Sequence, residues 1–351
     1  MPRVIGIDPG TVSLDLCGLA GGRVYLDASW PTAEALADPE GFLARLTSAG
    51  PPDLVVGPSG YGLPLRRAAD ASERDLRLAY LAAPDEAGGI GGLRAFVRRL
   101  AATALPMVLV PGVVHLDTVP EYRKLNRVDL GTADKVCAAA LAIREVQERT
   151  GRPTAAVSLL LLELGGAFTA GLAVRDGQIV DGIGGTSGPI GWRAAGALDG
   201  EVAFLAGEIG KDTLFGGGVE TVSGRAPGLR AAAVEAFVEG ALKAARQLMV
   251  AVPEPDVILL SGRHAEDRAV FERLARALID AAPVRRLEGF AVRAKQGAQG
   301  AAVLADGLAG GEYAPLVDRL RIREARGTVL DHLYVITPEQ AARRLGLDRN
   351  G

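Results

Sequence analysis

The chain has 351 residues, of which 48% are hydrophobic and 23% are charged, and its formal net charge is -3. A chain of this length predicts two domains, and the composition is that of a folded protein with ample core. The small negative charge gives no electrostatic footprint for nucleic acid. With 2 cysteines and 3 histidines, a disulfide framework and a cysteine or zinc metal site are disfavoured. No signal peptide opens the chain and no apolar run approaches a membrane span, so we expect a cytoplasmic protein.

The first part of the chain predicts a three-strand meander, after which strands alternate with helices. This order is typical of an α/β layered domain. The expected strands lie at 4–7, 14–20, 24–29, 53–57 and 107–110, and the expected helices at 39–49 and 93–104.

A helix is expected over residues 132–149, with Asp129 or Thr132 as its cap and Gly151 at its end. We interpret it as the bridge into a second lobe. That lobe is expected to contain a second meander at 156–183, helices at 201–206, 229–250, 266–281 and 294–308, and a strand at 257–260. The predicted domains are a first lobe at 1–130, a connecting helix at 131–151, a second lobe at 152–312 and a tail at 313–351. The tail carries a strand-like run at 333–336 and is expected to pack on the first lobe.

A short passage occurs twice, at residues 7–24 and 162–179. Aligned without a gap at an offset of 155, the two copies place Glu163 on Asp8 and a glycine on Gly10. Each copy predicts a strand that ends in a carboxylate, a glycine turn, a second strand, another glycine turn and a third strand. Two such hairpins suit two lobes that grip a polyphosphate and its metal ion. Glycine turns are also common in ordinary hairpins, so that interpretation stays open.

The first turn of each copy is the expected phosphate and metal site. Asp8 stands where a strand meets a tight turn and can orient a water bound to magnesium, and Glu163 is its counterpart. Glycine lets the backbone approach a phosphate, and a threonine adds a hydroxyl and an amide. The residues expected to bind phosphates are Gly10, Thr11, Gly165 and Gly166.

Asp134 lies in the first turn of the helix expected at 132–149, where the positive end of the helix dipole favours an ionised carboxylate. It could act as a general base on an attacking group or hold the metal, and a helix-start acid without a catalytic role is the alternative. Lys135 is expected to face solvent or a phosphate rather than to act in catalysis.

A strand–glycine–helix junction occurs at Ser261-Gly262-Arg263. Such a junction can place backbone amides beside the ribose or adenine of a nucleotide, and a simple turn is the other interpretation. The pattern of a P-loop does not occur in the sequence.

Three glycine-rich loops, at 57–62, 88–92 and 184–191, are longer than a tight connection needs and are candidates for substrate contacts. Flexible surface loops are the competing interpretation. We prefer the last loop, because it follows the third strand of the second copy. The candidate substrate residues are Ser59, Gly185, Thr186, Ser187 and Arg193.

Together these motifs resemble those of the superfamily of acetate and sugar kinases, chaperone ATPases and actin. Asp8-Pro-Gly-Thr11 resembles its first phosphate motif, and Glu163-Leu-Gly-Gly166 resembles the second, with Glu163 in place of the usual aspartate. The helix that begins with Gly131-Thr-Ala-Asp134 resembles the first connecting motif, and Ser261-Gly262 is similar to the adenosine motif. The resemblance covers about residues 3–310 and implies two ribonuclease H-like lobes around a nucleotide cleft, with magnesium-ATP bound.

Two narrower resemblances bear on the chemistry. The segment Gly-Thr-Ala-Asp-Lys at 131–135 is similar to one in type III pantothenate kinases whose aspartate serves as base, which implies that role for Asp134. Over its full length the chain resembles a prokaryotic family labelled as predicted butyrate kinases. Acetate and butyrate kinases usually carry asparagine where Asp8 stands, and Arg193 and Arg263 are the candidates for their substrate-binding residue.

The sequence therefore predicts phosphoryl transfer from ATP, with Mg²⁺, to a small molecule such as a short-chain carboxylate. We expect catalysis by positioning and charge neutralisation, with no nucleic-acid or membrane partner. A homodimer is one option for the oligomeric state. A regulatory or assembly ATPase that acts on a protein partner, and a binder that has lost turnover, are the alternatives.

Overall fold

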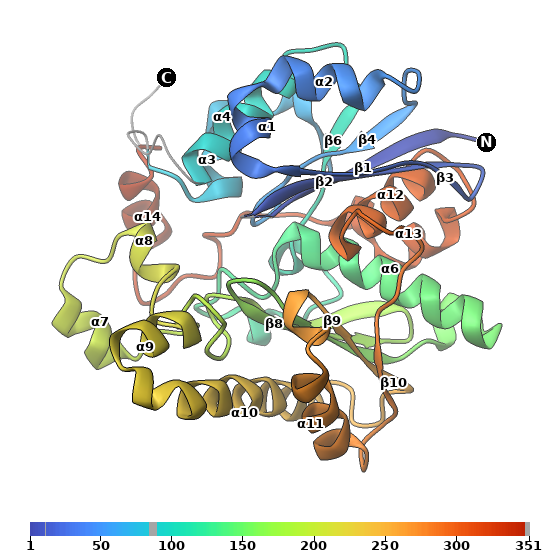
Figure 1. The fold of residues 1–351 in the computed structure, drawn as a ribbon. Coiled ribbons are helices and arrows are strands. Elements are labelled where there is room, and N and C mark those ends of the chain that lie inside the picture. The colour runs from blue at the N-terminus through green and yellow to red at the C-terminus, as the bar shows by residue number, and fades with distance from the viewer. Residues whose placement is uncertain (11, 84–89, 348–351) are drawn as a thin grey trace. The chain divides into compact units, whose positions relative to one another are not determined.

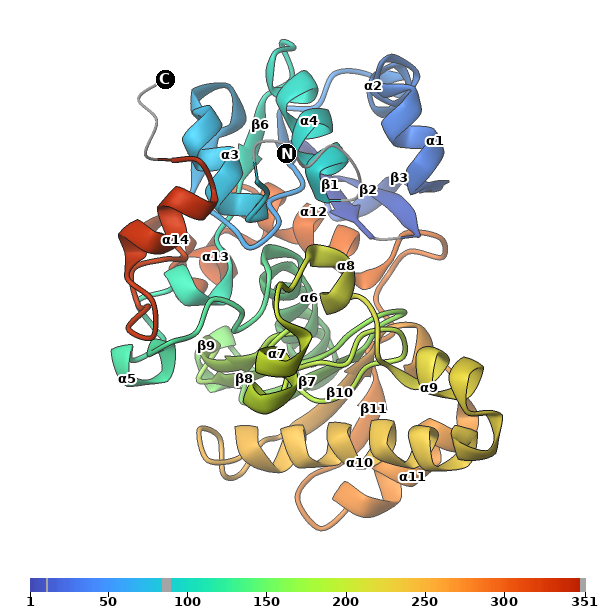
Figure 2. The same cartoon turned by 90° about the vertical axis from the view of Figure 1, so that its left-hand side faces the viewer.

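The computed structural model describes residues 1–10, 12–83 and 90–347, and the chain divides into two compact units. The first unit comprises Met1–Val128, Thr132–Ala155 and Gly289–Gly351. The second comprises Asp129–Gly131 and Ala156–Glu288. Each unit combines a mixed sheet with packed helices, so the α/β class is confirmed (Figures 1 and 2).

Within the described part of the first unit, the sheet has the strand order β3-β2-β1-β4-β6-β5. β1 is antiparallel to β2 and parallel to β4. The strands are β1 (Arg3–Pro9), β2 (Ser13–Ala20), β3 (Arg23–Pro31), β4 (Leu54–Val56), β5 (Arg66–Arg67) and β6 (Met107–Leu109). The helices are α1 (Thr32–Ala37), α2 (Pro39–Thr47), α3 (Glu73–Tyr80), α4 (Ile90–Ala101), α5 (Glu121–Lys124), α6 (Ala133–Thr150), α12 (Gln296–Leu308), α13 (Ala314–Leu320) and α14 (Pro338–Arg344).

The second unit repeats this plan with the strand order β11-β10-β7-β8-β9. Its strands are β7 (Leu159–Leu164), β8 (Thr169–Arg175), β9 (Gln178–Ile183), β10 (Val257–Ser261) and β11 (Val284–Arg286). Its helices are α7 (Gly200–Ala206), α8 (Lys211–Leu214), α9 (Val219–Arg225), α10 (Arg230–Leu248) and α11 (Arg268–Leu278). The apolar side chains of α10 and α11 form a buried core with those of β7 and β10.

The sequence repeat is also a structural repeat. In the first hairpin, β1–β2, Asp8 lies opposite Asp15, and in the second hairpin, β7–β8, Glu163 lies opposite Ala170, which is the same register. The outer strand pairs carry a register shift at corresponding places, after residue 18 in one copy and after residue 173 in the other. Such a matched irregularity is not required by a generic hairpin.

The two faces of the first hairpin have different chemistry. Because side chains alternate along a strand, Ile5, Ile7, Leu14 and Leu16 share one face, where they join a buried core with residues of α2 and α4. The intervening positions form the other face and are small or polar: Gly6, Asp8, Gly10, Ser13, Asp15 and Cys17. The hairpin therefore presents its polar atoms away from the apolar core.

Helix α12 packs on this second face through glycines. A Cβ on Gly6 would lie 2.2 Å from the Ala302 nitrogen, and a Cβ on Gly300 would lie 1.8 Å from the Cys137 carbonyl oxygen in α6. α12 is buried over nearly its whole length, as expected for a helix of alanine and glycine around its circumference. This packing brings the beginnings of α6 and α12 to the end of β1 (Figure 1).

The boundaries of the units differ from those expected from the sequence. Residues 289–312, expected in the second lobe, lie in the first unit, and α6, expected as a separate connector, is also part of that unit. The close backbone approach of α12 to β1 and α6 is the physical reason. The residues from 313 onward, the expected tail, are grouped with the first unit.

The strand expected at 333–336 is wrong, because this segment is irregular. The backbone N–H groups of Tyr334 and Val335 donate to Oδ1 of Asn126 at 2.7 and 2.9 Å. Their side chains are exposed. The apolar run is therefore a surface segment whose backbone is held by hydrogen bonds to Asn126. In the part of the chain that the structure describes, no helix is both long and apolar enough to cross a membrane.

Candidate functional site

Two carboxylates lie side by side at the end of the first hairpin. Asp8 is 8% exposed and Asp15, directly opposite it, is fully buried. The Ser13 hydroxyl donates to Oδ2 of Asp15 at 2.8 Å, and the Gly10 N–H donates to the Ser13 carbonyl at 2.9 Å, which closes the turn. Thr11, an expected phosphate ligand, lies outside the described residues. Sequence reasoning identified Asp8 and missed Asp15.

A third carboxylate, that of Asp134, stands in the first turn of α6. The Thr132 hydroxyl donates to it, and Lys135 Nζ lies 2.5 Å from its Oδ2. Burial raises the pKa of Asp134, but the ion pair with Lys135 and the Thr132 hydrogen bond outweigh burial and hold that pKa below its usual value. Lys135 is therefore engaged with Asp134 in the structure, and its side chain is only 15% exposed.

Asp8 and Asp134 both lie close enough to the buried thiol of Cys137 to act on it electrostatically. Its pKa is raised well above the usual value by burial, and then by the charges of Asp134 and Asp8. One of these carboxylates comes from β1 and the other from α6. The first unit thus brings together two of the acids that the sequence singled out.

The beginning of α12 completes this cluster. A Cβ on Gly297 would lie 2.7 Å from Oδ2 of Asp8, so glycine permits the first turn of α12 to approach that carboxylate. The positive end of the α12 dipole therefore faces the Asp8 carboxylate. Lys295, just before the helix, donates to the Ser13 hydroxyl at 2.6 Å and pairs with Asp15 at 3.1 Å. Lys295 was not predicted.

In the second unit, the residues of the other phosphate motif and the adenosine-like motif meet. Glu163 on β7 lies beside Ser261 in the parallel register of β10. Gly262 has φ +84°, and a Cβ there would lie 2.6 Å from the Leu164 carbonyl oxygen, so only glycine lets this turn approach Gly165. Ser261 Oγ is buried and has no hydrogen-bond partner among the described residues.

The second turn has the same backbone closure as the first. The Gly165 N–H donates to the Phe168 carbonyl at 3.0 Å, which matches the bond from Gly10 in the first hairpin. A Cβ on Gly166 would meet no atom within 4 Å, so the approach to this turn is open. The geometry leaves room for a ligand to contact the turn backbone.

The loop at 184–191 is fixed by Asp129. Oδ2 of Asp129 accepts hydrogen bonds from both the N–H and the hydroxyl of Thr186 at 2.9 Å, and the Ser187 hydroxyl donates to the Asp129 carbonyl. Gly185 lies against the Phe168 side chain. Asp129 is therefore a loop anchor, and of the two residues expected as the cap of α6, the structure has Thr132 at the N-cap position. The hydroxyls of Thr186 and Ser187 hold the loop in shape.

The side chains of Arg193 and Ser59 differ in exposure and in hydrogen bonding. The Arg193 N–H donates to the Ala167 carbonyl beside the second turn, while its side chain is 47% exposed and lies 3.9 Å from Glu220. Ser59 is buried; its hydroxyl donates to the Gly57 carbonyl and accepts from the Val110 N–H, each at 3.0 Å. The structure gives Ser59 a structural role, whereas Arg193 keeps a side chain that can reach a ligand.

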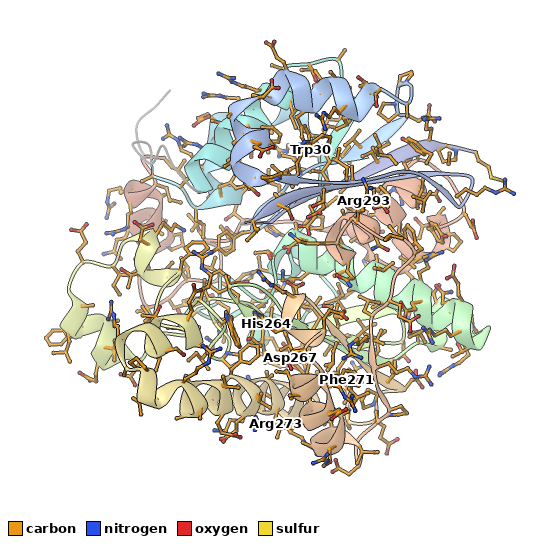
Figure 3. All side chains as sticks on the ribbon, viewed as in Figure 1. Trp30, His264, Asp267, Phe271, Arg273 and Arg293 are labelled. Carbon is orange, nitrogen blue, oxygen red and sulfur yellow. The ribbon has the colours of Figure 1, made fainter. Side chains whose placement is uncertain are left out.

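An aromatic stack that the sequence did not reveal follows the Gly262 turn. The rings of Trp192 and His264 are stacked with centroids 4.0 Å apart and an interplanar angle of 20°. Burial, and then the charge of Arg263, lower the pKa of His264. His264, labelled in Figure 3, lies two residues after Gly262, so the stack with Trp192 adjoins that turn.

The donor chemistry of the first unit is suited to Mg²⁺, which takes hard oxygen ligands and is usually held by one or two carboxylates together with waters and phosphates. Asp8 and Asp134 offer such oxygens. No group of three or more histidine, cysteine, aspartate or glutamate side chains that could hold a metal occurs among the described residues.

Comparisons with known proteins place this fold. A search of the curated proteins finds no match. Among solved structures, acetate kinase from Porphyromonas gingivalis is similar with a TM-score of 0.57 at 14% identity, covering 86% of this chain and 98% of that one. A propionate kinase from Francisella tularensis subsp. tularensis gives a TM-score of 0.55 at 14% identity, covering 86% and 99%. Acetate kinase from Entamoeba histolytica gives 0.54 at 11% identity, covering 79% and 85%.

The structural similarity shows that the chain shares the α/β fold of these acetate and propionate kinases, as the sequence motifs predicted. The family whose sequence pattern matches residues 6–335 is described as "Protein of unknown function (DUF1464)". The match spans nearly the whole chain, and the protein belongs to this family.

Proposed function

We propose that the protein transfers a phosphoryl group from ATP to a small molecule, with a short-chain carboxylate as the leading acceptor class. The observation that carries this proposal is the duplicated turn. Each unit ends a buried strand in a carboxylate and closes the next turn with the same backbone hydrogen bond, from Gly10 or from Gly165. Two such turns are suited to contact a polyphosphate through backbone N–H groups.

The roles of the residues follow from their surroundings. Asp8 and Glu163 would organise the magnesium ion, and Ser261 and Gly262 would contact the nucleoside. The phosphates would be bound by Gly10, Thr11, Gly165 and Gly166. Bound magnesium supplies neutralisation of phosphate charge, so catalysis needs positioning rather than covalent chemistry.

The surroundings of Asp134 favour a carboxylate as the acceptor. The carboxylate oxygens of Asp134 are already engaged, Oδ1 by the Thr132 hydroxyl and Oδ2 by Lys135, and these contacts hold its pKa below the usual value despite burial. An alcohol acceptor needs a base, whereas a carboxylate acceptor is already ionised at neutral pH. Asp134 would then orient the acceptor and the metal, and Arg193 is the candidate to bind the carboxylate. The names of two similar structures, an acetate kinase and a propionate kinase, support the same class.

The test is phosphoryl transfer by purified protein with magnesium-ATP and a panel of short carboxylates and small alcohols. We expect ADP formation that depends on one carboxylate and that falls by two orders of magnitude or more, roughly the contribution of a positioned catalytic group, in Asp134→Asn. Turnover with an alcohol but no carboxylate would overturn the acceptor class and assign Asp134 as base. ATP binding without transfer to any acceptor of either kind would contradict the kinase proposal.

A regulatory ATPase that acts on a protein partner is the second candidate, and α7 favours it. This short helix exposes Val202, Phe204 and Leu205, whose residue exposures are 52%, 79% and 80%. A cluster of exposed apolar side chains is a common feature of protein-binding surfaces. Slow hydrolysis that no small acceptor stimulates, with unchanged affinity for ATP in Phe204→Ser, would favour this candidate over the kinase.

A further inference from the structure

We propose that Lys295 binds the phosphate oxygens of the nucleotide at the first turn, and that Asp27 positions it there. The inference rests on the proposed function, since it assumes ATP as the ligand. Neither residue belongs to a motif that the sequence singled out. Both residues belong to the first unit.

Lys295 is placed over the turn by the hairpin itself. Its Nζ donates to the Ser13 hydroxyl at 2.6 Å and lies 3.1 Å from Oδ2 of Asp15. A Cβ on Gly10 would come within 2.6 Å of this ammonium, so the charge sits directly against the glycine of the turn. A cation at this point lies where a phosphate would approach the Gly10 backbone.

The ammonium is anchored on one side and accessible on the other. Asp15 has a side chain only 1% exposed, while the Lys295 side chain is 44% exposed. An ammonium has three N–H donors; the Ser13 hydroxyl accepts a hydrogen bond from it, and Asp15 forms an ion pair with it. Lys295 can therefore contact a ligand from solvent without leaving the hairpin.

Asp27 on β3 fixes the segment that leads into Lys295. Its carboxylate accepts hydrogen bonds from the N–H groups of Val292 at 2.9 Å, Arg293 at 3.0 Å and Ala294 at 2.7 Å. Burial raises the pKa of Asp27, but these three donors outweigh burial and keep that pKa below its usual value. Figure 3 shows Arg293 in this segment, beside the first sheet.

The second hairpin lacks this arrangement. At the positions of Ser13 and Asp15 it carries Phe168 and Ala170, which offer no side-chain acceptor for a lysine. The backbone turn is thus duplicated, but the cation is found at the first turn. A role in general hairpin stability would be needed equally in both copies, whereas a role in phosphate charge neutralisation is needed once.

The experiment measures the affinities of ATP, ADP and AMP by calorimetry with magnesium present. We expect Lys295→Met to weaken ATP binding on the order of tenfold to a hundredfold, as for loss of a hydrogen bond to a charged group, and to change AMP binding little. Lys243→Met is the matched control, because Lys243 is 76% exposed on α10 and pairs with Glu239. The control should bind all three nucleotides like the wild type.

A double variant separates the ligand role from neutralisation of Asp15. If Lys295 only balanced the buried carboxylate, adding Asp15→Asn to Lys295→Met would restore ATP affinity. We expect the double variant to stay weak for ATP. Restoration, or equal weakening of ATP, ADP and AMP by Lys295→Met alone, would overturn the inference.

Asp27→Ala tests the positioning role. We expect a smaller loss of ATP affinity than in Lys295→Met, again with AMP little changed, and faster amide hydrogen exchange over residues 292–296. Unchanged ATP affinity in Asp27→Ala would refute this part. A wild-type protein that binds no ATP would overturn the proposed function together with the inference, whereas wild-type binding that Lys295→Met leaves intact would overturn the inference alone.

Discussion

The first and second hairpins have nearly the same backbone and different side chains. Gly10 and Gly165 close their turns with matching hydrogen bonds, and the strand pairs share register and bulge position. The first hairpin carries the acid pair Asp8 and Asp15, whereas the second pairs Glu163 with an alanine.

This difference separates two features of the duplicated hairpin, the turn backbone, which both copies share, and the charged side chains, which they do not. A backbone that lets a phosphate approach depends on glycine and turn geometry, and both copies keep it. The charged side chains differ between the copies: Asp8, Asp15 and Lys295 gather at the first turn, next to the start of α12. The second turn instead adjoins Ser261 and Gly262, the residues proposed to contact the nucleoside.

The largest expected effect comes from removing, one at a time, the two acids at corresponding positions of the hairpins, Asp8 and Glu163. We expect Asp8→Ala to lower kcat by roughly a hundredfold or more, since one preorganised electrostatic group is lost, and Glu163→Ala to lower it less. The reason is that Asp8 shares its surroundings with Asp134 and the start of α12. Steady-state rates with saturating ATP and acceptor provide the comparison. A larger loss in Glu163→Ala would reverse the assignment of the two turns.

A substitution at Gly6 tests why helix α12 approaches the first hairpin. The position that corresponds to Gly6 in the second hairpin is Leu161, so the glycine belongs to the first copy alone. We expect Gly6→Ala to lower the free energy of unfolding by about 1–3 kcal/mol, because its Cβ would overlap Ala302. Urea unfolding measures the change.

Gly166→Ala is the matched control for Gly6→Ala, since its Cβ would meet no atom within 4 Å. It should leave the free energy of unfolding within about 0.5 kcal/mol of the wild type. Equal stabilities of the two variants would show that α12 does not require glycine on β1.

The smallest expected effect concerns the histidines of the two units. Burial lowers the pKa of His115 to about 4, whereas His264 is partly exposed in its stack. A histidine that is neutral when folded but takes a proton near its usual pKa when unfolded stabilises the fold fully above pH 6.5. That contribution is lost as the pH falls from 6.5 towards 4.

Between pH 7 and pH 5.5, His115 should therefore cost about 1 kcal/mol of stability. Urea unfolding at both pH values should show a shallower pH dependence in His115→Gln than in the wild type. His264→Gln should reduce the dependence less. A pH dependence that neither substitution changes would contradict the assignment to His115.

The sequence predicted the parts of the fold that depend on local pattern. Apolar strands, glycine turns and a constant offset were enough to place both hairpins and to align Asp8 with Glu163. Asp15 could also have been predicted, because a hairpin that pairs Pro9 with Leu14 also places Asp15 opposite Asp8. The short helices α3 and α14 carry capping boxes, Ser72 with Asp75 and Thr337 with Gln340, which are local sequence signals for the start of a helix.

Other features could not be predicted because they depend on contacts distant in sequence. Lys295 reaches Ser13 across 282 residues, and its placement requires α12 to pack on Gly6. The grouping of residues 289–312 with the first unit has the same origin. The hydroxyls of Ser59 and Thr186 looked available in sequence, yet backbone and carboxylate partners occupy them in the fold.

The most direct test of the central claim is amide hydrogen exchange with and without a non-hydrolysable ATP analogue and magnesium. If the duplicated turns bind the phosphates together, the analogue should slow exchange over residues 9–14 and over residues 164–169 in the same titration. Protection at one turn alone would contradict the paired role. Protection at neither turn, despite bound analogue, would place the nucleotide elsewhere in the molecule.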